Sequence, residues 1–173
     1  MLWVTRAHIR VNRAATGWLI RRFIDPQASF RFVEPDQVVR IQRDCHGIGF
    51  DAPGARYPHK DEIGRCSFEV LVAEYRPHDT ALRMLAGIVH RADFPEELAW
   101  RNPRTLAWQF DVLSQVAPES TAVSLDDAPG LRSISRGFPL VAADDHETLE
   151  RCAFLYDSLY ASLREQLGYA AQT

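Results

Sequence analysis

One sequence feature constrains the fold of this 173-residue chain most strongly. It is a predicted helix whose apolar face ends in an aspartate. Leu82, Leu85, Val89 and Asp93 follow one another at i, i+3, i+7 and i+11, which places them near one face of a helix. The apolar part of that face has to be buried, so Asp93 is carried toward the interior. It also lies in the last helical turn, where the helix dipole disfavours a negative charge. The fold must therefore supply a positive partner for Asp93.

Two kinds of partner meet that requirement. A divalent metal ion compensates both the dipole and the buried charge, and His90, three residues before Asp93 on the same helix surface, could bind the same ion. An arginine serves equally well, and Arg21 or Arg22 could reach Asp93. The residues alone leave both partners open.

Helical patterns outnumber strand patterns along the chain, with Asp36, Asp79 and Asp144 placed as N-caps and Gly47 as a C-cap. The alternation of apolar residues predicts strands over 2–11 and 29–35, with a short strand in the loop 48–64. Helices are predicted over 12–25, 36–47, 67–77, 79–94, 104–116 and 144–167, with a linker-like stretch over 117–130. The predicted fold class is α+β: a mostly helical single domain over 1–173 with a small N-terminal β-sheet.

The composition excludes several classes of protein. Hydrophobic residues make up 46% of the chain, charged residues 25%, and the mean hydropathy is −0.24, as in soluble globular proteins. A formal net charge of −3 argues against nucleic-acid binding driven by total charge, and no apolar run is long enough to span a membrane. No signal peptide is visible, and Cys45, Cys66 and Cys152 form no CxxC pair, which suits a reduced cytoplasm.

Histidines and acids in separate segments form a pool of candidate metal ligands. His59 lies in a loop, and His146 shares a helix face with Leu149, so the helix directs it toward the core. A hydrogen-bonded core histidine is the alternative for His146. Mixed imidazole and carboxylate ligands suit Zn, Mn or Fe. The complete pool is His59, His90, Asp93 and His146, with Asp145 or Glu34 assisting.

Arginines gather in the N-terminal third of the chain and form the candidate oxyanion-binding set, because forked guanidinium groups bind tetrahedral oxyanions through two hydrogen bonds. A solvated basic face is the alternative, and Arg21 can pair with Asp25 four residues later. Cys66, just before a helix, is a possible reactive thiol. Glycine-rich phosphate-binding motifs are absent, so no nucleotide cofactor is expected. The candidate oxyanion ligands are Arg6, Arg13, Arg21 and Arg22.

Four stretches, 3–36, 50–75, 85–94 and 137–164, resemble the C-terminal domain of the chromate-resistance ChrB family, in the expected order. Segments WLIRRFIDP and DDHETLE carry the resemblance most specifically. The chain departs from the family pattern at Thr16 and Gly17, where cysteine and proline are expected, and in a longer connection over 102–126. Full-length regulators of this family carry a further N-terminal, DNA-binding-type region. The chain begins at the C-terminal domain, so DNA binding is not expected of it alone.

The resemblance implies a cytoplasmic role in chromate or oxyanion stress, with no membrane association. The leading hypothesis is a metal- and oxyanion-binding domain with a sensing or binding role and a small oxyanion such as chromate as its partner. A metal-dependent oxidoreductase acting on chromate or reactive oxygen species is the first alternative. A non-catalytic interaction module, working through a partner or as a homodimer, is the second.

Overall fold

The computed structural model describes residues 1–96 and 127–168. It confirms the predicted α+β class, a mostly helical chain with a small parallel sheet at the N-terminus. The predicted helix over 104–116 and the linker residues 117–126 lie outside the described residues. No helix in the described ranges combines the length and the hydropathy of a membrane span.

The sheet contains β1 (Leu2–Arg6), β2 (Ser29–Val33) and β3 (Ile48–Gly49), in the order β2-β1-β3. Both neighbours run parallel to β1. The strand predicted over 2–11 is shorter, because His8 adopts a positive φ of 59° and a helix begins at Val11. All three strands therefore end at the same edge of the sheet.

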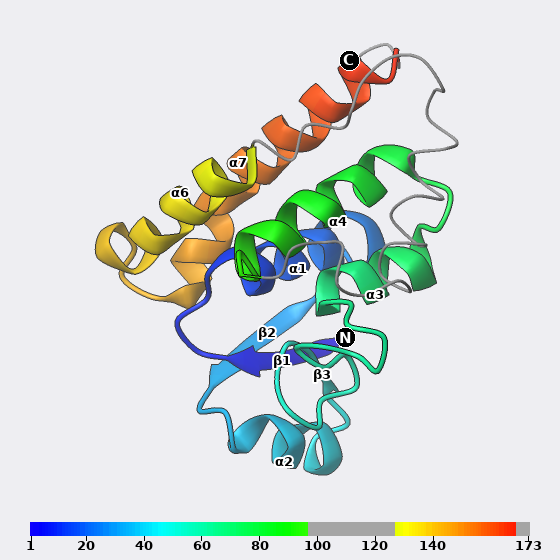
Figure 1. Cartoon of the computed structure of the whole chain (residues 1–173). Helices are drawn as coiled ribbons and strands as arrows, with labels where there is room; N and C mark the ends of the chain where they lie inside the picture. Colours follow the sequence, from blue (N-terminus) through cyan, green and yellow to red (C-terminus); the bar gives the residue numbers. More distant parts are fainter. Residues whose placement is uncertain (97–126, 169–173) are drawn as a thin grey trace.

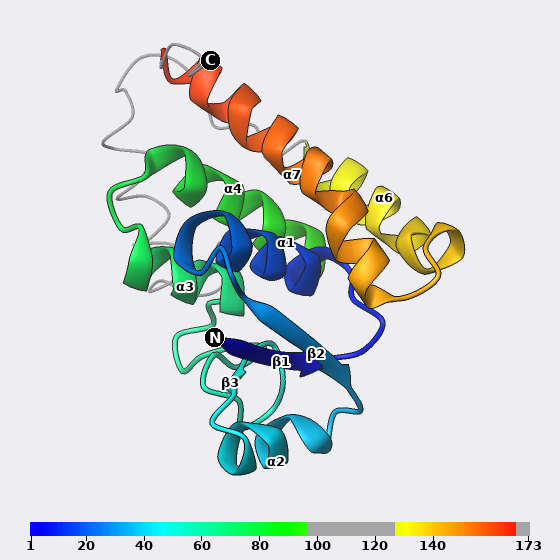
Figure 2. The ribbon, with the colours of Figure 1, turned by 180° about the vertical axis from the view of Figure 1, so that it is seen from behind.

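Helices cover both faces of this sheet. α2 (Gln37–Asp44) packs on one face, and α1 (Val11–Leu19), α3 (Ser67–Tyr75) and α4 (Thr80–Asp93) lie on the other (Figures 1 and 2). Val4 of β1 packs toward α2, whereas its neighbour Trp3 joins the larger core beneath the other helices. From β1 the chain passes through α1 to β2 on one side of β1, and from β2 it passes through α2 to β3 on the other side of β1. In open parallel sheets, ligands bind where the strand order reverses in this way, beyond the carboxyl ends of the strands.

The long helix α7 (Asp145–Gln166) fastens the helical layer together. The Tyr156 hydroxyl donates to the Val11 carbonyl at 2.9 Å, and the Tyr160 hydroxyl donates to Asp79 at 2.7 Å. Gly17 permits the close approach of α1 to α7, because a Cβ at this position would lie 2.8 Å from a methyl carbon of Leu149. α7 thus holds α1 and α4, which carry several residues of the site described below.

Most predicted helix boundaries are confirmed, with Asp79 and Asp144 capping α4 and α7 through their side chains. α1 continues as a π-helical turn, η1 (Ile20–Ile24), and ends before Pro26 as predicted. Asp36 is at the N-cap of α2 but its side chain makes no cap hydrogen bond, and the C-cap is Cys45 instead of Gly47.

One helix was not predicted. α6 (Asp127–Val141) begins within the linker-like stretch and packs against α4 and α7. It contains Gly130, Gly137 and Pro139, and the low helix propensity of glycine and proline makes the segment resemble a linker.

Candidate metal and oxyanion site

Asp51, which follows β3 after one residue, is the buried centre of a polar network at the carboxyl ends of β1 and β3. Arg6 Nε donates to the Asp51 carbonyl at 2.7 Å and its Nη2 to Oδ2 at 3.1 Å. Arg13 Nη1 donates to Oδ2 at 3.0 Å, and Asn12 Nδ2 donates to Oδ1 at 2.7 Å. His59 Nδ1 lies 2.6 Å from Oδ1. These five residues, together with Asp93, are called the Asp51 cluster.

The local sequence explains this convergence. Arg6 ends β1, Asn12 and Arg13 lie in the first turn of α1, and Asp51 adopts a left-handed backbone conformation with φ of 51°. Burial alone raises the pKa of Asp51, but the hydrogen bond from His59 and the charges of Arg13, His59 and Arg6 hold it below its usual value. Asp51 is therefore ionised in the folded protein at neutral pH.

Asp93 reaches this network from the end of α4. Its Oδ2 lies 3.9 Å from His59 Nδ1, beyond hydrogen-bond distance, and is a buried atom with no hydrogen-bond partner among the described residues. Burial, reinforced by the charge of Asp51, raises the pKa of Asp93, although the charges of His59, Arg13 and Arg6 oppose the rise. Asp51, His59 and Asp93 each offer one metal-ligand atom within 4.8 Å of the others.

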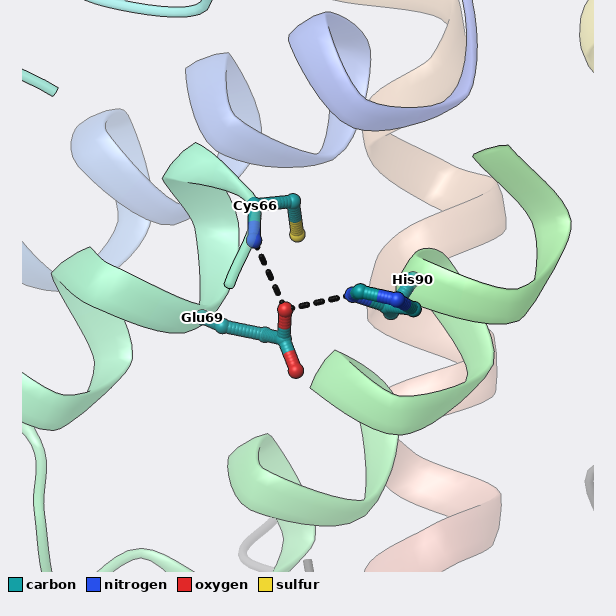
Figure 3. Close-up of side chains that lie close together, drawn as sticks. All are labelled: Cys66, Glu69 and His90. Carbon is teal, nitrogen blue, oxygen red and sulfur yellow. Dashed lines mark hydrogen bonds and ion pairs between the residues drawn. The ribbon is translucent and has the colours of Figure 1, made fainter. Parts of the chain in front are cut away.

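A second group of donors, called the Cys66 cluster, lies where the N-terminus of α3 meets α4 (Figure 3). Glu69 Oε2 accepts a hydrogen bond from the Cys66 backbone N–H at 2.7 Å and lies 2.6 Å from His90 Nδ1. All three residues are buried. Burial, followed by the charge of Glu69, raises the pKa of the Cys66 thiol well above its usual value. Without an ion the thiol is protonated and unreactive, which does not favour the predicted reactive thiol.

The two clusters share a boundary. Asn12, which donates to Asp51, accepts from the Phe68 N–H of α3 through its Oδ1 at 3.3 Å. The Phe94 ring contacts both imidazoles, with ring centroids 4.9 Å from His59 and 5.0 Å from His90. His90 and Asp93, predicted as co-ligands of one ion, therefore belong to different clusters.

A positively charged side chain, Lys60, lies beside Phe94 where the two clusters meet. Lys60 Nζ lies 4.0 Å from the centre of the Phe94 ring. Burial lowers the pKa of Lys60, while the negative charge of Asp93 opposes that change. Lys60 therefore adds positive charge between the clusters.

Three members of the predicted ligand pool lie elsewhere. The Asp145 carboxylate accepts from the backbone N–H groups of His8 and Ile9, both at 2.8 Å, and fixes the loop between β1 and α1. His146 is exposed and packs on the Phe32 ring at 4.9 Å, so the prediction that it faces the core is wrong. Glu34 is exposed after β2. None of the three belongs to either group of metal-ligand atoms found in the described ranges.

The predicted arginines divide in the same way. Arg6 and Arg13 bind Asp51, whereas Arg21 lies over the Phe30 ring at 5.3 Å and Arg22 pairs with Asp157 at 3.4 Å. The predicted pairing of Arg21 with Asp25 does not occur, since Asp25 accepts from the Trp3 indole and pairs with the Met1 amino group. In the described part of the chain no arginine forms an ion pair with Asp93. The arginine alternative for Asp93 is thereby excluded within those residues.

Comparison with known proteins gives the family. The model of the ChrB C-terminal domain matches residues 3–122. The chain belongs to this family. Protein ChrB of Cupriavidus metallidurans is 42% identical over 94 residues, which are 53% of this chain and 26% of the relative, so the chain spans only a minor part of that relative's length. No solved structure matches the chain.

Three polar residues of this ChrB domain were missed in the sequence. Asp51 lies in a stretch that reads as a loop, and only its position after a short parallel strand could have indicated it. Glu69 lies three residues after Cys66, the spacing of a capping box, which the structure confirms. No sequence pattern indicated a role for Asn12. The Thr16 hydroxyl donates to Asn12 Oδ1 at 3.4 Å and extends the same network.

Proposed function

We propose that this domain binds a divalent transition metal ion and a small oxyanion together at the Asp51 cluster. Asp51, His59 and Asp93 would hold the metal, and Arg6 and Arg13 would hold the oxyanion beside it. The observation that carries the proposal is the buried Asp93 Oδ2, which has no hydrogen-bond partner among the described residues although it lies between basic groups. A buried carboxylate oxygen without a partner costs roughly 1–3 kcal/mol, and a bound cation would remove that cost.

Charge balance favours joint binding over binding of either ligand alone. With His59 counted as uncharged, the guanidiniums of Arg6 and Arg13 balance the carboxylates of Asp51 and Asp93. A divalent cation alone leaves two excess positive charges in a partly buried site, and a chromate dianion alone leaves two negative ones. Both together restore neutrality. Each ligand should therefore raise the affinity for the other.

The side chains around the site are partly exposed, and the site lies where the sheet topology favours ligands. Side-chain exposure is 39% for His59, 26% for Arg6 and 22% for Asp93, whereas Asp51 beneath them is 1% exposed. An incoming ion thus meets His59 and Asp93 first, above an Asp51 that the arginines already orient. Two carboxylates and one imidazole suit Mn²⁺ or Fe²⁺ better than a soft metal.

The family sets the biological context of the proposal. A ChrB domain that binds an oxyanion next to a metal would serve chromate resistance as a binding or sensing module in the cytoplasm, a location that suits three free cysteines. Association as a homodimer belongs to the interaction-module alternative and stays a prediction. Turnover of chromate or of reactive oxygen species would need a redox-active metal with an open coordination position, and it is the second candidate.

Titration calorimetry with Mn²⁺, in the absence and presence of chromate, tests the proposal. The intact protein should bind about one equivalent, with higher affinity when chromate is present, and His59→Ala or Asp93→Asn should abolish this binding. His146→Ala, an exposed histidine outside the cluster, is the matched control and should bind as the parent does. Full Mn²⁺ binding by both site variants would refute the proposal. Loss of the chromate absorbance during incubation with the metal-loaded protein and a reductant would distinguish turnover from binding.

A further inference from the structure

We propose that the Cys66 cluster is a second, separate cation site, selective for Zn²⁺ and similar borderline metals. It lies beyond the proposed metal and oxyanion site and shares no ligand with it. Cys66 Sγ, one carboxylate oxygen of Glu69 and one imidazole nitrogen of His90 would supply the three protein ligands. The ion would join the N-terminus of α3 to α4.

The first support is a buried carboxylate of which only one oxygen has partners in the described part of the chain. Glu69 has no measurable solvent exposure, and its Oε1 has no hydrogen-bond partner among the described residues. Its Oε2 interacts with a backbone N–H and with His90, and within the described ranges no arginine or lysine lies at ion-pair distance from Glu69. Asp51, by contrast, has two guanidiniums. A carboxylate of this kind is tolerated in a protein interior when a cation completes its surroundings.

The second support is the geometry of the donors. Cys66 Sγ, one carboxylate oxygen of Glu69 and one imidazole nitrogen of His90 lie within 4.8 Å of one another. The side chains converge from two helices onto one point (Figure 3). Zinc bonds of about 2.0–2.3 Å in tetrahedral geometry separate ligand atoms by roughly 3.4–3.8 Å. Where the ion binds the two atoms of the 2.6 Å contact between Glu69 and His90, that contact has to open by about 0.8 Å.

The donor set points to the class of metal. One thiolate, one carboxylate and one imidazole form a mixed set of borderline softness, which favours Zn²⁺ over Mn²⁺ or Mg²⁺. Three protein ligands leave a fourth tetrahedral position for water or another ligand. Cysteine binds a metal as the thiolate and not as the thiol, so metal binding releases the Cys66 proton to solvent. No electron transfer is involved.

Cobalt(II) reports on this site directly, because a cobalt–thiolate bond produces a charge-transfer absorption band that oxygen and nitrogen ligands do not. Co²⁺ added to the full chain under reducing conditions should produce this band, and Zn²⁺ should remove it by displacement. Cys66→Ser should abolish the band. Cys152→Ser, which changes another buried free cysteine, should leave it intact.

Two further variants separate this site from the proposed function. Asp93→Asn should lose Mn²⁺ binding at the Asp51 cluster but retain the cobalt–thiolate band, and Glu69→Gln should weaken the band while His59 and Asp93 remain unaltered. The inference is overturned if Co²⁺ gives no thiolate band with the unaltered chain, a result that does not depend on whether any variant folds. It is equally overturned if the band persists in Cys66→Ser.

Discussion

The Asp51 cluster and the Cys66 cluster lie next to each other and accommodate a buried carboxylate in different ways. Asp51 is surrounded by two guanidiniums, an amide and an imidazole, so its own charge is compensated before any ligand arrives. Glu69 has one backbone N–H and one imidazole, and one of its oxygens lacks a partner among the described residues. We infer from this comparison that the arginines would let the first site take an anion as well as a metal, whereas the second would take a cation alone.

Removal of Asp51 should produce the largest loss of stability. Asp51→Ala leaves Arg6 and Arg13 facing each other without their shared carboxylate, and breaking a buried pair in this way costs about 3–5 kcal/mol of unfolding free energy. Urea denaturation of the metal-free protein measures it. Asp44→Ala, which removes an exposed partner of Arg40 and Arg43, is the control and should change little. An equally small change for Asp51→Ala would mean that the cluster is not a structural unit.

Asn12 joins the two clusters, so Asn12→Ala should disturb both. The substitution removes the amide donor to Asp51 and leaves the buried Phe68 N–H without an acceptor, at roughly 1–3 kcal/mol for each unsatisfied group. Calorimetry should then show weaker Mn²⁺ binding at one site and weaker Co²⁺ binding at the other. A loss confined to one site would show that the clusters are independent.

In the metal-free protein, Glu69→Gln should lower the unfolding free energy less than Asp51→Ala or Asn12→Ala does. Glutamine retains an oxygen that can accept the Cys66 N–H, and only the charge-assisted contact with His90 is lost, which is worth about 1.5 kcal/mol. Thermal or urea unfolding measures the difference. A cost above that of Asp51→Ala would reverse the proposed contrast between the clusters.

Asp93→Asn should slightly stabilise the metal-free protein at neutral pH while it abolishes metal binding. The raised pKa of Asp93 means that its charged form opposes folding, and this penalty is present at neutral pH and disappears as the pH falls through the folded pKa. The lowered pKa of Asp51 has the opposite sign, so its stabilisation is lost only as the pH falls below about 3.8, the usual value, through the folded pKa. Urea unfolding at pH 7 and at pH 4 should show the gain from Asp93→Asn shrinking at the lower pH. A loss of stability at pH 7 would contradict this account.

The helices and the sheet could be predicted largely from sequence because caps and apolar periodicity are local signals, as at Asp79 and Asp144. α6 was not predicted because its glycines and its proline have low helix propensity, which packing against the other helices overrides. The prediction of an unusual charge at Asp93 came from local periodicity, and His59 was predicted in the same ligand pool, but Asp51 was not. Asp51 is far from Asp93 in sequence, and the packing of α4 against α1 and α3 brings them together. Asp145 was predicted to assist in the metal site as the neighbour of His146, whereas its oxygens accept from the backbone N–H groups of His8 and Ile9.

Anomalous diffraction tests the central claim most directly, because it locates and identifies a bound metal in one measurement. Crystals grown with Mn²⁺ and chromate should show a manganese peak between the side chains of Asp51, His59 and Asp93, with a chromium peak beside Arg6 and Arg13. If neither peak lies there, and Asp93 instead forms an ion pair with a guanidinium, the account of this site is wrong.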